Sequence, residues 1–382
     1  MRGKNVVGSR RRKLRRRLAA VAICLAAGSL SVAAYGSTKG PSASKSSSKG
    51  PIYVLYPETN LPAWPLYYLP YLVKALKKDL PGRQIVELSG NNDAATQLPQ
   101  VEAAITAHAS GVIYSPVDPA TAGGPLKEFA AAHIPVVGYL NDPDGGPVYA
   151  YVWVNFGIAG QYFGKLLQSS LIKSVGHTPV RLAEIYGDPS FAVYHDWLKG
   201  ASPYLDPLVK SGKVKVVCQA DTTGWAPPAA QTEMDQCLTK TGNGVDAVLT
   251  MNDSVADGIA AALGSQKLLG KVKIWGGHDA ELTAVQRILA GDQLATFHID
   301  GTEIGPAAGA LLAAAIAGKP AKSTGYINGV FNNKFSKTVP LVYGREILVT
   351  PSNINQTILQ AKLYTKSQIC APGIAASTAF CK

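Results

Sequence analysis

The sequence lacks the residue spacings on which metal sites and common catalytic centres depend. It has only five cysteines and six histidines in 382 residues, and no Cys-x-x-Cys or His-x-x-x-His spacing occurs. It also has no Gly-x-Ser-x-Gly nucleophile motif and no Gly-x-x-x-x-Gly-Lys phosphate loop. Metal-binding proteins and many enzymes carry such motifs. We therefore expect no metal, no cofactor and no enzymatic activity.

Acidic residues are absent from the first 17 positions, which hold nine of the 37 lysines and arginines. The formal net charge of +12 would suggest a nucleic-acid partner, but without these nine residues the remaining chain is nearly balanced. Proteins that bind nucleic acid present a basic surface. We therefore expect no nucleic-acid partner.

The basic segment Ser9–Arg17 precedes an apolar, alanine-rich run, Leu18–Gly36. This order is typical of a secretory signal peptide, here residues 1–36, and predicts export to the periplasm or the cell surface. The general secretory and twin-arginine routes both stay open, because Lys13 stands where a twin-arginine signal prefers an aromatic residue. An uncleaved membrane anchor is the alternative, since the run has the minimum length of a spanning helix. Residues 37–50, rich in Ser, Lys and Gly, predict a flexible spacer.

Cleavage of the signal would remove Cys24 and leave an even number of cysteines in an oxidising compartment, where disulfides are stable. Four cysteines allow three pairings. The simplest joins neighbours in the sequence, Cys218 with Cys237 and Cys370 with Cys381. Free buried thiols are the alternative.

Short β-rich runs alternate with longer helical segments from residue 51 onward. The first strand, Ile52–Tyr56, is followed by a helix, Trp64–Lys78, and a second strand, Gln84–Leu88. A second series of the same kind begins after Val152–Asn155. This alternation predicts parallel sheets with helices on both faces, and the chain length predicts two domains.

Four short motifs in the second half occur in a specific order and spacing. They are Ser211–Val217, Gly224-Trp225, Asn252-Asp253 and Gly277–Leu282. With them, the stretch from Val209 to Asp300 closely resembles the periplasmic sugar-binding family, and within it the D-xylose-binding branch. The segment from Pro340 to Tyr364 is similar to the closing segment of that family.

The resemblance implies an α/β protein of the type I periplasmic binding fold. Two doubly wound parallel-sheet lobes are joined by a three-crossing hinge, with the ligand in the inter-lobe cleft. Independently, ligands of open α/β sheets bind at the carboxyl ends of the strands. The crossings are expected near Val154, near His298 to Asp300 and near Tyr326. The N-terminal lobe then comprises residues 51–154 and 299–325, the C-terminal lobe residues 155–298 and 326–369, and the tail residues 370–382.

The resemblance also implies which side chains contact a sugar. Trp225 would stack on the ring, Asn252 and Asp279 would bond its hydroxyl groups, and Trp64 is a second candidate for stacking. Each has a structural alternative, because tryptophans also pack in cores and Asn and Asp also cap helices. The remaining tryptophans of the predicted domains, Trp153, Trp197 and Trp275, are expected to be structural.

The sequence departs from the family at three places in the expected site. Leu140 and Asn141 stand where many relatives have an Asp-Arg pair. His195 lies about where relatives use a basic residue, and His298 and Ile299 replace a polar or cationic side chain. We therefore count Asn141, His195 and His298 as candidate ligand contacts. Because arginine offers a rigid fork of donors, its loss is expected to change the choice of ligand.

These observations together predict an exported, monomeric solute-binding protein. It would capture a monosaccharide or similar small polar ligand by hinge closure and deliver it to an ABC permease with its ATPase. The alternative is a sensory receptor for a non-sugar ligand that is not coupled to transport. The sensor half of a transcription factor is excluded, because no helix-turn-helix precedes the predicted lobes.

Overall fold

The structure is a computed structural model that describes residues 49–58, 61, 63–370 and 378–382. The predicted signal peptide or anchor, and all but the last two residues of the predicted spacer, lie outside these ranges. Within them, no helix has both the length and the hydropathy that a membrane span requires.

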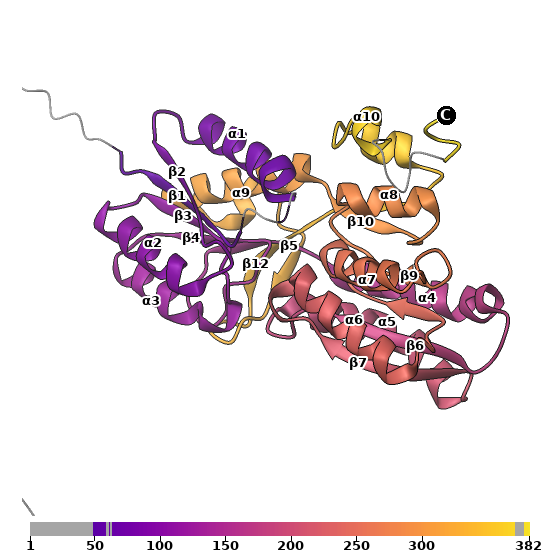
Figure 1. Cartoon of the computed structure of the whole chain (residues 1–382). Coiled ribbons are helices and arrows are strands. Elements are labelled where there is room, and N and C mark those ends of the chain that lie inside the picture. Colours follow the sequence, from indigo (N-terminus) through magenta and orange to yellow (C-terminus); the bar gives the residue numbers. More distant parts are fainter. Residues whose placement is uncertain (1–48, 59–60, 62, 371–377) are drawn as a thin grey trace, which may run out of the picture. The chain divides into compact units, whose positions relative to one another are not determined.

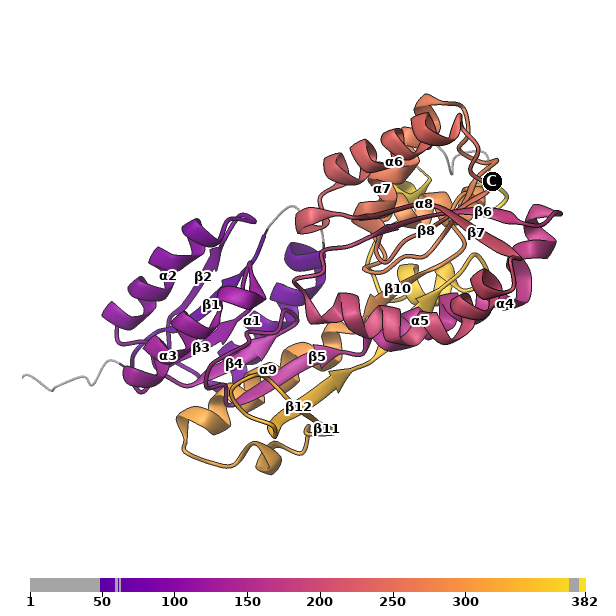
Figure 2. The same ribbon diagram turned by 90° about the horizontal axis from the view of Figure 1, so that it is seen from below.

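The first lobe is built on a seven-stranded sheet with the order β11-β12-β5-β4-β3-β1-β2 (Figures 1 and 2). All neighbouring strands are parallel except β11, which runs antiparallel to β12. Strands buried on both faces are expected to be apolar throughout, as β1 (IYVLY) is. The strands are β1 (Ile52–Tyr56), β2 (Ile85–Ser89), β3 (Gly111–Tyr114), β4 (Val136–Tyr139), β5 (Ala150–Val154), β11 (Gly329–Phe331) and β12 (Val339–Gly344).

Helices cover both faces of this sheet. Alternate residues of β1 serve the two cores: Ile52 and Val54 pack with α1 and α9, whereas Tyr53 and Leu55 pack with α2 and α3. This division follows from the period of two along a strand. The helices are η1 (Trp64–Tyr68), α1 (Leu69–Asp79), α2 (Ala94–Thr106), η2 (Pro119–Thr121), α3 (Gly123–Ala131), α9 (Gly301–Ile316) and η4 (Ala321–Thr324).

The second lobe has a four-stranded, wholly parallel sheet with the order β7-β6-β8-β9. Helices α4 and α5 cover one face and α6 and α7 the other. Gly160 in α4 allows the close approach of α5, because a Cβ there would overlap the carbonyl oxygen of Trp197. The strands are β6 (Val180–Tyr186), β7 (Val214–Asp221), β8 (Ala247–Leu249) and β9 (Lys273–Trp275). The helices are α4 (Phe156–Val175), α5 (Ala192–Lys210), η3 (Thr223–Trp225), α6 (Pro227–Thr241), α7 (Asp253–Ser265), α8 (Leu282–Ala290), η5 (Asn355–Leu359) and α10 (Lys366–Ile369).

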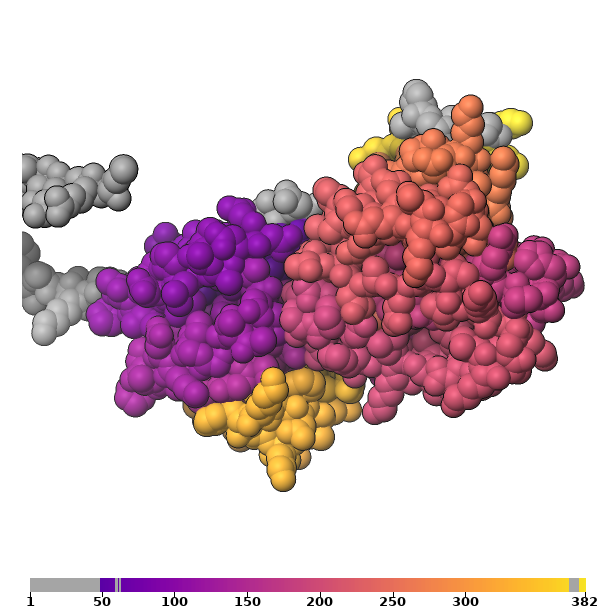
Figure 3. All heavy atoms as spheres, turned by 60° about the horizontal axis from the view of Figure 1, so that its bottom comes forward, coloured from indigo at the N-terminus to yellow at the C-terminus, as the bar shows by residue number. Residues whose placement is uncertain are grey.

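The chain crosses between the lobes after β5, after β10 (Thr296–Ile299) and between β12 and β13 (Glu346–Val349). Strands β10 and β13 pair with each other as an antiparallel ribbon. The predicted third crossing near Tyr326 is wrong. Strands β11 and β12 extend the first sheet beside β5, so the chain stays in the first lobe up to Gly344. Figure 3 shows the corresponding yellow-orange segment against the first lobe.

The predicted disulfide pairing is confirmed. Cys218 in β7 is bonded to Cys237 in α6, and Cys370 is bonded to Cys381. The first bond ties an edge strand to the helix that covers it. The three tryptophans expected to be structural are fully buried.

The double substitution Cys218→Ser/Cys237→Ser should lower the free energy of unfolding by about 3 kcal/mol, since the bond closes a loop of moderate length in the unfolded chain. Chemical denaturation of the oxidised protein and the variant would measure the difference. Equal unfolding free energies would contradict a stabilising role for this bond.

Candidate functional site

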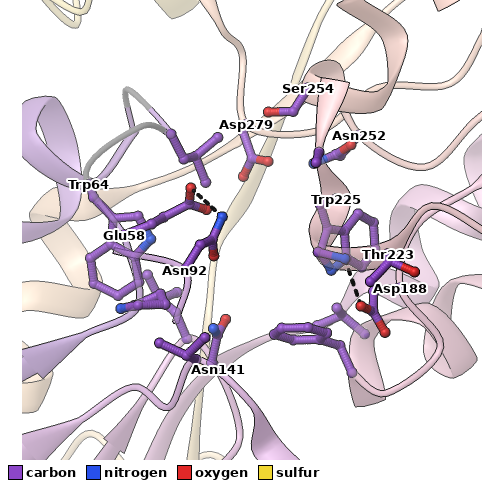
Figure 4. A pocket seen from close by; sticks show the side chains of 18 of the residues that line it. Glu58, Trp64, Asn92, Asn141, Asp188, Thr223, Trp225, Asn252, Ser254 and Asp279 are labelled. Carbon is purple, nitrogen blue, oxygen red and sulfur yellow. Dashed lines mark hydrogen bonds between the residues drawn. The ribbon is translucent and has the colours of Figure 1, made fainter. Parts of the chain in front are cut away.

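A cleft of about 1030 Å³ lies between the two lobes. Its lining comes from the loops that follow β1, β2, β3 and β4 in the first lobe and β6, β7, β8 and β9 in the second. Figure 4 shows the labelled side chains of the two lobes facing each other. The carboxyl ends of both parallel sheets therefore meet at one cavity, which is where α/β sheets bind ligands.

Trp225 lies on the second-lobe side of the cleft, in the short helix η3 after β7. Its indole is half-buried and is edge-on to Phe191, with ring centres 6.1 Å apart. Its φ of +56° is a backbone conformation that a bulky residue rarely adopts. The loop is held by Asp188, whose carboxylate accepts a 2.7 Å hydrogen bond from the backbone N–H of Gly224. An aromatic ring of the second lobe is thus part of the cavity wall.

Trp64 also lines the cleft, but it belongs mainly to the first-lobe core. Only 3% of its surface is exposed. Its ring stacks on Tyr56 at 5.6 Å and meets Tyr68 and Tyr139 edge-on. The cleft and core alternatives both hold for this residue, because one part of the ring forms the cavity wall while the rest packs inside.

Asn252 both caps a helix and lines the cleft. Its side-chain oxygen accepts a 3.0 Å hydrogen bond from the backbone N–H of Val255 in the first turn of α7. The amide nitrogen makes no hydrogen bond to a described residue, although the residue is only 5% exposed. Asn252 therefore has the predicted capping role, and its amide nitrogen is still available to donate a hydrogen bond to a ligand in the cavity.

Asp279 does not cap a helix. Helix α8 begins only at Leu282, and both Asp279 and Ala280 have positive φ angles, of +91° and +48°. The Asp279 carboxylate accepts a 3.2 Å hydrogen bond from the Tyr68 hydroxyl of the first lobe. It also lies 3.1 Å from Nδ1 of His278. One carboxylate thus joins the two lobes at the cleft.

His278 is a fully buried cation at the hinge. Its Nε2 lies 3.1 Å from a carboxylate oxygen of Glu346 in β13, and its ring stacks on Phe156 at 4.0 Å. Burial alone would lower the pKa of His278, but hydrogen bonds to Asp279 and Glu346 outweigh it and raise this pKa to about 10. The protonated ring therefore donates to a cleft carboxylate on one side and to the third crossing on the other.

A second buried network lies beneath this loop. The Asp253 carboxylate accepts hydrogen bonds from the Thr296 hydroxyl at 2.7 Å, from the Gln293 side chain at 2.8 Å and from the backbone N–H of Glu281 at 3.1 Å. Burial raises the pKa of Asp253 to about 7, although Arg287 acts in the opposite direction. These bonds fix the loop that carries Asp279 to the start of α7, which carries Asn252.

Asn141 lines the first-lobe side of the cleft. Its amide nitrogen donates a 3.0 Å hydrogen bond to the carbonyl of Pro116, which leaves the side-chain oxygen free to accept one. Leu140 and Ile299, the two apolar residues noted as departures from the family, also line the cavity.

The structure does not bring His195 or His298 into the cleft. His195 lies on the exposed face of α5, where its Nε2 is 3.0 Å from the Pro189 carbonyl. His298 is buried in β10, and burial lowers its pKa. Because side chains alternate along a strand, Ile299 reaches the cavity and His298 points away from it. Both were wrong as candidates for the cavity wall.

Several cleft residues were not predicted. Glu58, Asn92, Asp188 and Glu281 all line the cavity, and Asn92 donates a 3.2 Å hydrogen bond to Glu58. The sequence contained a usable signal, because Glu58, Asn92 and Asp188 come soon after β1, β2 and β6, and Glu281 lies in the loop after β9. Applying the strand-end rule to every strand would have found them.

Two α/β lobes that share a cleft and are joined by three short crossings define a two-lobed ligand-binding protein. Residues 52–320 match the family of the periplasmic binding protein domain. The chain therefore belongs to this family of solute-binding proteins.

Individual relatives resemble most of the chain. The D-xylose-binding periplasmic protein of Haemophilus influenzae is 30% identical over 77% of this chain and 85% of its own length. The multiple sugar-binding periplasmic receptor ChvE of Rhizobium radiobacter is 27% identical over 73% of this chain and 82% of its own. A solute-binding protein of an ABC transporter from Clostridium phytofermentans, solved with bound β-D-glucose, shares the fold. Its TM-score is 0.71 at 22% identity, covering 83% of this chain and 99% of that one.

The buried His278 should make stability depend on pH. Its folded pKa of about 10 lies above the unfolded value of about 6.5, so its stabilisation is fully present below that lower value and is lost as the pH rises through about 10. His278→Gln should be less stable than the parent at neutral pH and should lose less stability between pH 7 and 10. Denaturant unfolding at several pH values would give the slope of the unfolding free energy against pH for the parent and for the variant. The exposed His195→Gln is the matched control, and equal slopes in parent and His278→Gln would contradict this assignment.

Proposed function

We propose that this protein captures a monosaccharide or a similar small polar ligand in the inter-lobe cleft and delivers it to an ABC import permease. The observation that carries the proposal is the composition of the cleft, where an aromatic face and fixed polar groups line one cavity. Flat apolar faces suit the C–H side of a sugar ring, and amide and carboxylate groups suit its hydroxyls. The sugar-binding names of the relatives support the same class of ligand.

Each side chain has a distinct role in this proposal. Trp225 stacks on the ring of the ligand. Asn252 donates a hydrogen bond from its free amide nitrogen, and Asp279 accepts one from a hydroxyl group. From the first lobe, Asn141 accepts a further hydrogen bond and Trp64 contributes part of the apolar wall. A ligand held by groups of both lobes favours the closed state, and this differential affinity drives closure.

The size of the cleft supports a closing motion. Its volume of about 1030 Å³ is at the upper end of the range for drug-sized ligands, which is far more than a monosaccharide fills. Rotation about the three crossings would reduce this volume and exclude water. The protein would act by binding and release of its ligand. Export by the signal peptide predicted for residues 1–36 would place it in the periplasm or at the cell surface.

A thermal-shift screen of pentoses, hexoses, polyols, amino acids and small aromatic compounds tests this function. A ligand present at about 100 times its Kd should stabilise the folded protein by about 2.7 kcal/mol, because it binds only the folded state. Binding of a carbohydrate should also change the tryptophan fluorescence through Trp225. If amino acids or aromatic compounds shifted Tm and no carbohydrate did, the sugar assignment would be wrong.

Gly187 determines where the Trp225 ring lies. It follows β6, and a Cβ at this position would overlap three carbon atoms of the indole ring. Because the backbone of Gly187 itself has no positive φ in the structure, the substitution acts through the ring and not through backbone strain.

Gly187→Ala should therefore displace the indole and weaken ligand binding by about tenfold, or about 1.4 kcal/mol, with little change in Tm. Isothermal titration with the carbohydrate identified in the screen would measure the effect. Gly264→Ala in α7 is the control, since a Cβ there meets no atom within 4 Å. Unchanged affinity in Gly187→Ala would refute stacking by Trp225.

A further inference from the structure

The charges that line the cleft are of one sign. Eight of the described lining residues carry a carboxyl group, and none of them is lysine, arginine or histidine. Two of the eight have a cation behind the cleft wall, Asp257 with Arg287 and Asp279 with His278. The other six form no ion pair with a described residue. A cleft lined by one sign of charge raises the local concentration of ligands of the opposite sign.

Two of the acids without an ion pair, the part-buried Glu58 and the buried Glu281, lack a compensating charge. Burial, followed by repulsion from Asp279, raises the pKa of Glu58 to about 7. Burial, followed by repulsion from Asp253, raises the pKa of Glu281 to about 9. An opposite charge within a few ångströms would favour ionisation of both groups. A bound cation would therefore supply the positive charge that these two carboxyl groups lack within the protein.

Two independent features of the cleft indicate what kind of cation fits. Trp225 and Phe191 line the cavity, and aromatic rings attract organic cations. Asn252, which is 95% buried with a free amide nitrogen, calls for an oxygen acceptor on the same ligand. The ligand thus needs both a positive charge and oxygen atoms that accept hydrogen bonds.

A metal ion does not meet these conditions. No group of three His, Cys, Asp or Glu side chains within the described part of the chain is placed to hold one. The acids are instead spread over loops of both lobes. An ammonium group suits such a distribution, because a single charged nitrogen donates up to three hydrogen bonds and needs only one or two carboxylates.

We infer that the preferred ligand of this cleft is an amine-bearing sugar or polyol, bound as its ammonium form between Glu58 and Asp279. This inference rests on the proposed function and specifies its substrate class. The absence of an arginine beside Asn141 agrees with it, since a guanidinium there would repel the ammonium group. The ring of the ligand stacks on Trp225, and its oxygen atoms accept from Asn252.

Isothermal titration with matched sugar pairs tests the inference. The pairs are D-glucosamine with D-glucose and D-galactosamine with D-galactose, at a pH that keeps the amine protonated. N-acetyl-D-glucosamine provides a nitrogen without charge. We expect the Kd of the better amine sugar to be lower by about tenfold or more than that of its neutral parent, with a preference that shrinks at high ionic strength. N-acetylation should remove this advantage.

Glu58→Gln supplies a second readout. It should raise the Kd of the amine sugar by about tenfold and leave that of the neutral parent within about twofold, because only the charged hydrogen bond is lost. The exposed Glu128→Gln on α3 is the matched control. If neutral sugars bind at least as tightly as their amine counterparts, the inference is overturned while the proposed function stands. If no sugar of either kind binds, both are overturned.

Discussion

Parallel strands that are joined by helical crossovers must all end at the same edge of their sheet, and this constraint positions every polar group in the cleft. In each lobe, four successive strands deliver a loop to the cavity. Because the two sheets are hinged at three crossings, those loops face one another across a single space. The recognition chemistry therefore depends on the connectivity of the sheets more than on any local motif.

The hinge carries an electrostatic feature of its own. A buried imidazolium, His278, connects a cleft carboxylate with Glu346, which follows the third crossing directly. Tyr68 adds a hydrogen bond from the first lobe to the same carboxylate, that of Asp279. The Asp279 carboxylate thus links a residue of the first lobe, Tyr68, with the buried His278 and, through it, with Glu346 at the hinge. The contacts of Tyr68 and His278 are both made to Oδ1 of Asp279, so the second carboxylate oxygen has no partner among the described residues.

Much of the fold follows from local patterns. The apolar run Ile52–Tyr56 is β1 with the predicted bounds, and the even number of cysteines led to the correct pairing. The third crossing could not be located in this way, because a short strand such as β12 has the same pattern in either sheet. The backbone conformation of Asp279 was also not visible in the sequence. Its φ is positive, and it contacts Tyr68 of the first lobe and Phe297 of β10, which lie far from it along the chain.

The sequence by itself determined the α/β class and the two domains, because the order of strands and helices and the length of the chain encode these. Its resemblance to the family indicated Trp225, Asn252 and Asp279. Only the tertiary structure decided that Ile299 faces the cavity while His298 does not, and that His195 lies outside it. It also decided that the cavity wall is acidic, with its cations held behind it. The direction in which a side chain points, and which side chains it lies near, depend on packing between segments that are distant in the sequence. No local sequence pattern contains this information.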